Sequence, residues 1–223
     1  MKKTASLIMA SALIICSFAS CTDNSKAIIG KWEMKELSDT DINVGGLEFK
    51  ENGKGSMYMD TTNILHADGK SLVVGSGEQA VKFEEDMIEY DGKNFNINLQ
   101  GQDILSLEKV SGGESTDSYD GEYELKSGVM HDSIVGNITK NADDTVNGDV
   151  SLFISFDGSS SEVTFVDIFD YKVNKNKLEL SGYASFIGDS ADGKPVSADV
   201  EIKDDVMTIT SSENEKEELV KVK

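Results

Sequence analysis

The chain has 223 residues and a mass of 24.2 kDa, which is enough for one large domain or two small ones. With 38% hydrophobic residues, 28% charged residues and a single proline, it is not a collagen-like, proline-rich or multi-span membrane protein, and it is expected to fold around a core. Acidic residues outnumber basic ones by 41 to 21, and the sequence contains no arginine. This balance argues against nucleic-acid binding, because a phosphate backbone needs a basic face.

The first 20 residues have the features of a secretory signal peptide. Lys2 and Lys3 precede an apolar run over residues 5–18, which is too short to span a membrane as a mature helix. Two small residues, Ala19 and Ser20, then precede Cys21. We therefore expect the chain to be exported.

The segment Phe18-Ala19-Ser20-Cys21 resembles the lipobox of bacterial lipoproteins. Both cysteines of the chain lie here, and Cys16 is the poorer candidate for modification because the bulky Ile15 precedes it. The resemblance implies that Cys21 becomes the lipidated first mature residue, that residues 22–26 form a polar tether, and that the protein is anchored on the extracytoplasmic side of a membrane, at the cell surface or on the periplasmic face. Removal of residues 1–20 would leave 19 lysines and 41 acidic residues, a charge of −22.

Apolar and polar residues alternate with period two through most of the remaining chain. The clearest case is residues 94–100, in which Phe95, Ile97 and Leu99 alternate with polar side chains. This pattern predicts antiparallel strands with one buried face, and no stretch has the sustained period of a core helix. Hairpin turns are predicted at Asn52-Gly53, Asp68-Gly69, Asp91-Gly92, Asp157-Gly158 and Asp192-Gly193. The predicted fold class is all-β.

The strand pattern is interrupted once by a segment without apolar residues. Residues 27–110 carry eight predicted strands, enough to close a small barrel. Residues 111–118 are rich in Gly, Ser and acidic side chains and are expected to form a linker. We therefore predict one domain over 27–110 and a second over 119–223.

The second segment repeats features of the first in the same order. Residues 30–35 match 121–126, with Gly30 and Trp32 aligned to Gly121 and Tyr123. Three further pairs of blocks align: 47–53 with 152–158, 81–92 with 171–182, and 95–107 with 196–209. An internal duplication of one β domain is the favoured interpretation, although period-two patterns also align by chance.

The Gly-x-Trp of residues 30–32, followed by a β-meander, resembles the lipocalin-like domains of bacterial lipoproteins. The resemblance implies two tandem small antiparallel up-and-down barrels, or half-open barrels. It also implies that Trp32 packs in the core at a closed barrel end. In that family an arginine stacks on the tryptophan, and Lys109 is expected to replace it in part because the chain lacks arginine.

Residues that would support catalysis or metal binding are sparse. The two histidines, His66 and His131, have no ligand-spaced partner and are expected at the surface, and no Gly-x-Ser-x-Gly motif is present. Paired carboxylates are numerous but fit an acidic surface, and no loop has the arrangement of a calcium cage. We expect neither an enzyme nor a bound cofactor or metal.

Two functions are compatible with these features. The first is a lipocalin-like binding protein that holds a small apolar ligand in its second domain. Smaller side chains replace larger ones there at four matched positions, which form the candidate cavity: Val173, Val196, Ala198 and Val200. The alternative is a cell-surface interaction protein that contacts another protein or a glycan through its outer faces, with no internal ligand.

Overall fold

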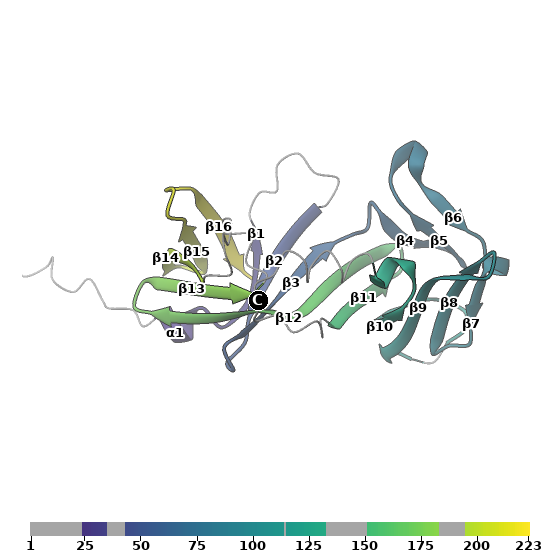
Figure 1. Ribbon diagram of the computed structural model, residues 1–223, viewed down its shortest axis with the longest axis horizontal. Coiled ribbons are helices and arrows are strands. Elements are labelled where there is room, and N and C mark those ends of the chain that lie inside the picture. The colour runs from purple at the N-terminus through teal and green to yellow at the C-terminus, as the bar shows by residue number, and fades with distance from the viewer. Residues whose placement is uncertain (1–23, 35–42, 114, 133–150, 183–194) are drawn as a thin grey trace, which may run out of the picture.

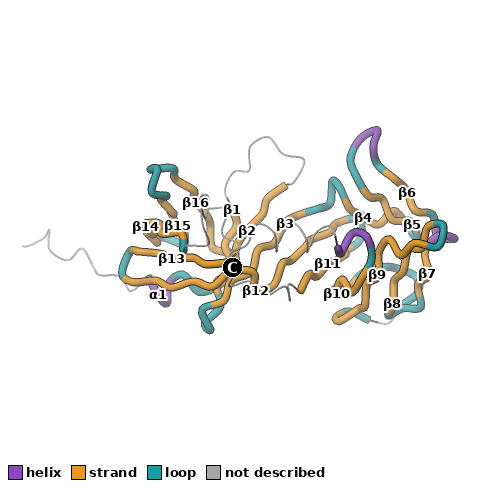
Figure 2. The backbone as a smooth tube through the Cα atoms, in the orientation of Figure 1, coloured by secondary structure: helices purple, strands orange, loops and turns teal. Residues whose placement is uncertain are grey.

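The computed structural model describes residues 24–34, 43–113, 115–132, 151–182 and 195–223. The predicted lipidation site Cys21 and the predicted turn at Asp192-Gly193 lie outside these ranges. Within them the fold is all-β, as the alternation predicts, and strands make up nearly all of the regular structure (Figure 2).

Eight antiparallel strands form a closed β-barrel. The strands come from the two ends of the chain, and the barrel closes because β13 pairs with both β14 and β12. A short helix, α1 (Asn24–Ala27), precedes the first strand. In barrel order the strands are β1 (Gly30–Met34), β2 (Asn43–Phe49), β3 (Lys54–Asp60), β12 (Ser160–Asn174), β13 (Lys177–Gly182), β14 (Val196–Lys203), β15 (Val206–Thr210) and β16 (Lys216–Lys221).

The residues between β3 and β12 form a second lobe at the other end of the long axis (Figure 1). Five of its strands extend the barrel sheet beyond β12, and three form a separate small sheet in the order β4-β5-β6. The lobe strands are β4 (Leu65–Asp68), β5 (Ser71–Val74), β6 (Val81–Phe83), β7 (Ile88–Tyr90), β8 (Asn94–Leu99), β9 (Gln102–Ser111), β10 (Gly121–Ser127) and β11 (Ser151–Asp157), with 3-10 turns at Gly77–Gln79 and Glu85–Met87.

The 15-residue strand β12 belongs to both parts of the molecule. Its first half pairs with β11, its second half pairs with β13, and β3 lies along its other edge. The change of partner coincides with an irregularity between Phe165 and Phe169, where Asp167 has a φ of 54°. Asp167 is held there by a 3.1 Å hydrogen bond from its N–H to the Ser56 hydroxyl and by a 2.6 Å ion pair with Lys50. A bulge of this kind bends a strand, which lets one strand serve two curved sheets.

This arrangement differs from two tandem barrels, which the structure does not confirm. β1 pairs with β16 and β3 pairs with β12, so each predicted half contributes strands to the one closed barrel. Residues 111–118 are not a linker between domains, because they connect β9 and β10, two neighbouring strands of one sheet. Tyr119 follows them directly and is only 4% exposed. Alternation predicts strands, but it carries no information about which strand pairs with which.

The pairing leads to a prediction about which part of the chain folds alone. Asp60 and Glu162 are direct partners across β3 and β12, so a two-residue turn can join 24–60 to 162–223 and keep all eight barrel strands. We expect this shortened chain to unfold cooperatively in urea, because its barrel core is retained. A fragment of residues 27–110 should lack a cooperative transition, because it contains only three of the barrel strands. Cooperative unfolding of the fragment with none for the shortened chain would contradict the observed topology.

Candidate functional site

The Gly-x-Trp motif fixes one end of the barrel. Trp32 is fully buried, and its Nε1 donates a 2.6 Å hydrogen bond to the Ile28 carbonyl. The Lys221 ammonium lies 5.1 Å from the centre of the indole ring and donates a 3.1 Å hydrogen bond to the Ala27 carbonyl. A side chain at Gly30 would approach the Lys221 Cε to 3.3 Å, and the φ of Gly30 is +124°. Glycine at this position therefore lets the lysine cross over the indole.

The matched motif in the lobe repeats this geometry around Tyr123. Tyr123 is fully buried, and its hydroxyl donates a 2.9 Å hydrogen bond to the Tyr119 carbonyl, again four residues before the aromatic residue. Lys109, from the neighbouring strand β9, lies with its ammonium 5.2 Å from the ring centre. Gly121 has a φ of +135°, and a side chain there would come within 3.0 Å of the Lys109 Cε. The two motifs are thus equivalent in three dimensions.

The equivalence corrects two details of the sequence alignment. Lys109 stacks on Tyr123, so the prediction that it would serve Trp32 is wrong, and Lys221 of β16 takes that place. Gly30 pairs with Phe49 and Gly121 pairs with Phe156, so Phe49 corresponds to Phe156 and not to Ile154. The two-residue offset arises because the turn after β2 is longer than the turn after β11.

An aromatic cluster surrounds Tyr123 and fills the lobe. Tyr90, Phe95, Tyr119 and Phe156 contact one another or Tyr123 with ring centres 4.9–6.5 Å apart. Burial raises the pKa of Tyr119 to about 12, and burial together with the hydrogen bond to Tyr90 raises the pKa of Tyr123. Tyr119 and Tyr123 therefore stay neutral at ordinary pH, and the cluster acts as packing with hydrogen-bonded hydroxyl groups.

The four residues of the predicted ligand cavity all lie in the barrel. Ala198 and Val200 of β14 are buried in the hydrophobic core, whereas Val173 and Val196 are partly buried against it. They share this core with Trp32, Phe49 and Phe169, each at most 1% exposed. Large inward side chains predicted for the first domain and small ones predicted for the second are therefore combined in one barrel interior.

A shallow polar pocket lies at the junction of barrel and lobe. Its volume is about 260 Å³, and it opens on the outer face where β3 ends and the β11–β12 hairpin begins. Its walls contain only hydroxyl and carboxyl side chains, from Asp60, Thr62, Ser155, Asp157, Ser160, Ser161 and Glu162. None of these residues was among the predicted site residues, because they share no sequence motif. Five of them belong to the β11–β12 hairpin, and the pairing of β3 with β12 brings Asp60 and Thr62 to it.

Hydrogen bonds around Ser161 fix the floor of this pocket. The buried Ser161 hydroxyl bonds to the Thr61 hydroxyl at 2.8 Å and donates to the Leu65 carbonyl of β4. Its N–H donates to the Thr62 hydroxyl at 3.1 Å, and the Thr62 N–H donates to the Asp60 carboxylate at 2.9 Å. At the rim, Lys31 approaches Glu162 to 3.8 Å with both side chains about 40% exposed. The polar groups of the floor are thus hydrogen-bonded to one another, and Ser155, Asp157 and Ser160 line the remaining wall.

The remaining candidate groups are isolated within the part of the chain that the structure describes. His66 lies in β4 and His131 in a helical segment at 129–132, and the Nδ1 of His131 contacts the exposed Asp132 at 3.1 Å. The described ranges hold no cluster of three His, Cys, Asp or Glu side chains suited to a metal ion. Nor does any helix within those ranges have the length and apolar character needed to cross a bilayer.

Comparison with known proteins adds no relative. No protein-family model matches the chain, and searches of curated proteins and of solved structures found no match.

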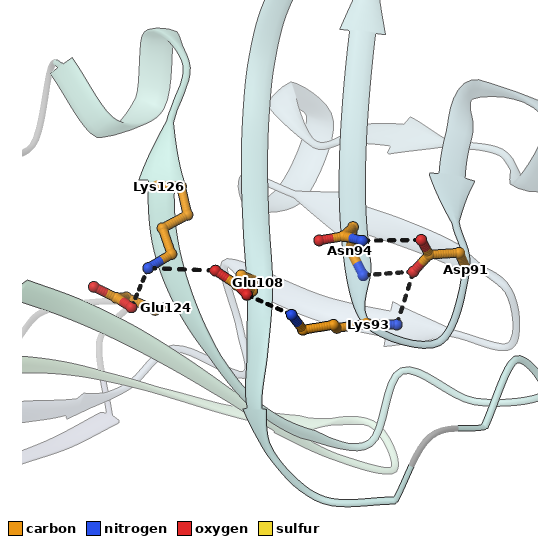
Figure 3. Close-up of polar contacts among 6 residues, drawn as sticks. All are labelled: Asp91, Lys93, Asn94, Glu108, Glu124 and Lys126. Atoms are coloured by element: carbon orange, nitrogen blue, oxygen red, sulfur yellow. Dashed lines mark hydrogen bonds and ion pairs between the residues drawn. The ribbon is translucent and has the colours of Figure 1, made fainter.

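At the far end of the lobe, the β7–β8 turn is held by a carboxylate. Asp91 accepts hydrogen bonds from the N–H of Lys93 at 2.9 Å, the N–H of Asn94 at 2.7 Å and the Asn94 amide at 2.9 Å (Figure 3). Lys93 in turn pairs with Glu108 of β9 at 2.7 Å. The bonds from Asn94 and Lys93 lower the pKa of Asp91 from its ordinary 3.8 to about 2.

The lowered pKa of Asp91 predicts a pH dependence of stability. A carboxyl group whose pKa is lower in the folded state stabilises the fold above its unfolded pKa, and this contribution disappears as the pH falls through the folded pKa. The free energy of unfolding should therefore fall from about pH 4 to about pH 2, in part through Asp91. Asp91→Asn should flatten this interval in urea titrations, because its amide does not titrate. An unchanged slope for the variant would show that the turn contributes nothing.

Proposed function

We propose that the protein is a lipid-anchored extracytoplasmic binding protein that contacts a glycan through its outer surface, at the polar pocket between barrel and lobe. The observation that carries the proposal is the contrast between interior and exterior. The barrel interior contains Trp32, Phe49 and Phe169, and the lobe interior contains Phe95 and Tyr123, all essentially unexposed. The pocket on the outer face is open, and every side chain in its lining carries a hydroxyl or a carboxyl group.

The chemistry of the pocket favours a neutral or amino sugar. Carboxylates accept hydrogen bonds, and serine and threonine hydroxyls both accept and donate, so the pocket suits a ligand with many hydroxyl donors. Asp60, Asp157 and Glu162 give it negative charge, and no lysine is among its lining residues. Acidic sugars and phosphorylated ligands would be repelled.

A small apolar ligand in the barrel is the second candidate. It is favoured by the small side chain of Ala198 beside the partly buried Val173 and Val196. The large aromatic residues in the same interior favour a filled barrel, because the interior of an eight-stranded barrel is small enough for such side chains to fill. We therefore place the apolar ligand second.

The anchoring part of the proposal is tested at Cys21. Cys21→Ala should move the protein from the membrane fraction to the soluble fraction, because the chain then lacks the thiol that would carry the lipid. Cys16→Ala serves as the matched control and should leave the protein in the membrane fraction. Retention of the Cys21→Ala variant on membranes would contradict lipid anchoring.

The pocket is tested by filling it. Ser155→Tyr places a ring in the pocket, whereas Ser151→Tyr changes the same strand on the same side without touching the lining. On a panel of immobilised neutral and amino-sugar glycans, Ser155→Tyr should weaken binding about tenfold or more, a loss of about 1.4 kcal/mol, and the control should bind like the wild type. Saturable binding of an apolar fluorescent dye that Ala198→Phe abolishes and Ser155→Tyr leaves intact would instead support the apolar ligand.

A further inference from the structure

Residues 24–28 are fixed to the end of the barrel. Asn24, the first residue of α1, is 6% exposed, and its amide donates a 3.2 Å hydrogen bond to the Val200 carbonyl of β14. Lys221 bonds the Ala27 carbonyl, and the Ile28 carbonyl accepts the Trp32 indole. Ile28 itself is fully buried. Asn24, Ala27 and Ile28 are therefore held against the barrel, so residues 24–26 pack on the fold, whereas the sequence predicted that they belong to a polar tether.

The position of Asn24 limits how far the barrel can be from a lipid on Cys21. Only Thr22 and Asp23 separate the two residues. Three residue steps span at most about 11 Å even when fully extended. A lipid on Cys21 would hold the α1 end of the barrel next to the headgroups of the bilayer.

Lysines are concentrated in α1 and in the turns around it. The register places three hairpin turns at this end. The backbone N–H of Val200 donates to the Asn176 carbonyl in the β12–β13 turn, and the backbone N–H of Lys221 donates to the Asp205 carbonyl in the β14–β15 turn. Gly30 pairs with Phe49, which precedes the β2–β3 turn. Together α1 and the turns 50–54, 174–177 and 203–206 hold six lysines and three acidic residues, in a chain with 21 basic and 41 acidic residues. Three of these lysines, Lys50, Lys54 and Lys177, form ion pairs with Asp167, Asp170 and Asp199 of the flanking strands. Lys26, Lys175 and Lys203 are exposed and form no ion pair with any described residue.

We propose that the α1 end of the barrel is a membrane-contacting surface that rests on anionic phospholipid headgroups, so that the β4–β11 lobe is presented away from the membrane. The inference rests on lipidation of Cys21, because the short link from Cys21 to Asn24 sets the distance between the barrel and the bilayer. The lysines set the preference for anionic lipid. Surface charges act over about a Debye length of 8–10 Å, so the basic end is attracted even though the whole protein is acidic. The lobe lies at the opposite end of the long axis from α1 (Figure 1).

Hydrogen exchange on a tethered protein tests this orientation without relying on lipidation in cells. The mature chain from Cys21 onward has a single thiol, which can be coupled to a maleimide lipid in vesicles of phosphatidylcholine, with or without phosphatidylglycerol. Amides in 24–28 and 172–178 should exchange more slowly on vesicles than in solution, with the larger effect on anionic vesicles. Amides of the lobe strands β5 to β8 should be unchanged. Slowing of exchange over the lobe, or none over 172–178, would overturn the proposal.

Lysine variants separate surface contact from simple attachment. Each lysine close to an anionic surface strengthens partitioning about fivefold. The triple variant Lys26→Gln/Lys175→Gln/Lys203→Gln should therefore lose roughly 100-fold of the additional vesicle binding that phosphatidylglycerol gives. Amide exchange over 172–178 should return to its level on neutral vesicles. The control Lys70→Gln/Lys82→Gln/Lys93→Gln removes the same charge from the lobe and should change nothing. Equal effects of the two variants would refute specific contact by the α1 end. If Cys21→Ala stays in the membrane fraction of cells, lipid anchoring is refuted. The vesicle measurements do not depend on that outcome, because there the lipid is attached to the protein chemically.

Discussion

The pairing of one strand with two sheets determines the shape of this protein. A strand of 15 residues is far longer than the usual five or six, and β12 uses this length to close the barrel with its second half and to begin the lobe with its first. The bulge at Asp167 makes this change of partner feasible, because it bends the strand while Ser56 and Lys50 satisfy the displaced groups. The lobe is thus an extension of the barrel sheet.

Each part of the molecule contains a fully buried aromatic residue, two positions after a glycine, that is covered by a lysine. Trp32 with Lys221 and Tyr123 with Lys109 have the same arrangement: glycine two residues earlier, a hydrogen bond to a carbonyl four residues earlier, and a lysine from the neighbouring strand. Lysine lacks the planar fork of arginine, but its stem covers apolar surface while its ammonium reaches a backbone carbonyl, Ala27 for Lys221 and Gly113 for Lys109. This contact explains how an arginine-free sequence covers both rings.

The charge distribution divides the surface into regions with different expected contacts. Acidic and hydroxyl side chains line the pocket at the junction, where the proposed glycan would bind. Lysines gather on α1 and the adjacent turns, where the proposed anchor would hold the barrel against headgroups. The two surfaces lie on different parts of the molecule, so membrane contact and ligand binding would not compete.

The sequence by itself determined the all-β class, most strand positions, four of the hairpin turns and the two Gly-x-aromatic motifs. These features are local: alternation reports one buried face, and Asp-Gly or Asn-Gly reports a tight turn at the same place in the chain. Only the tertiary structure decided that β1 pairs with β16 and β3 with β12, because hydrogen bonds between strands are alike for any two alternating segments. The junction pocket was equally inaccessible, since Asp60 and Ser155 are 95 positions apart and meet only through that pairing.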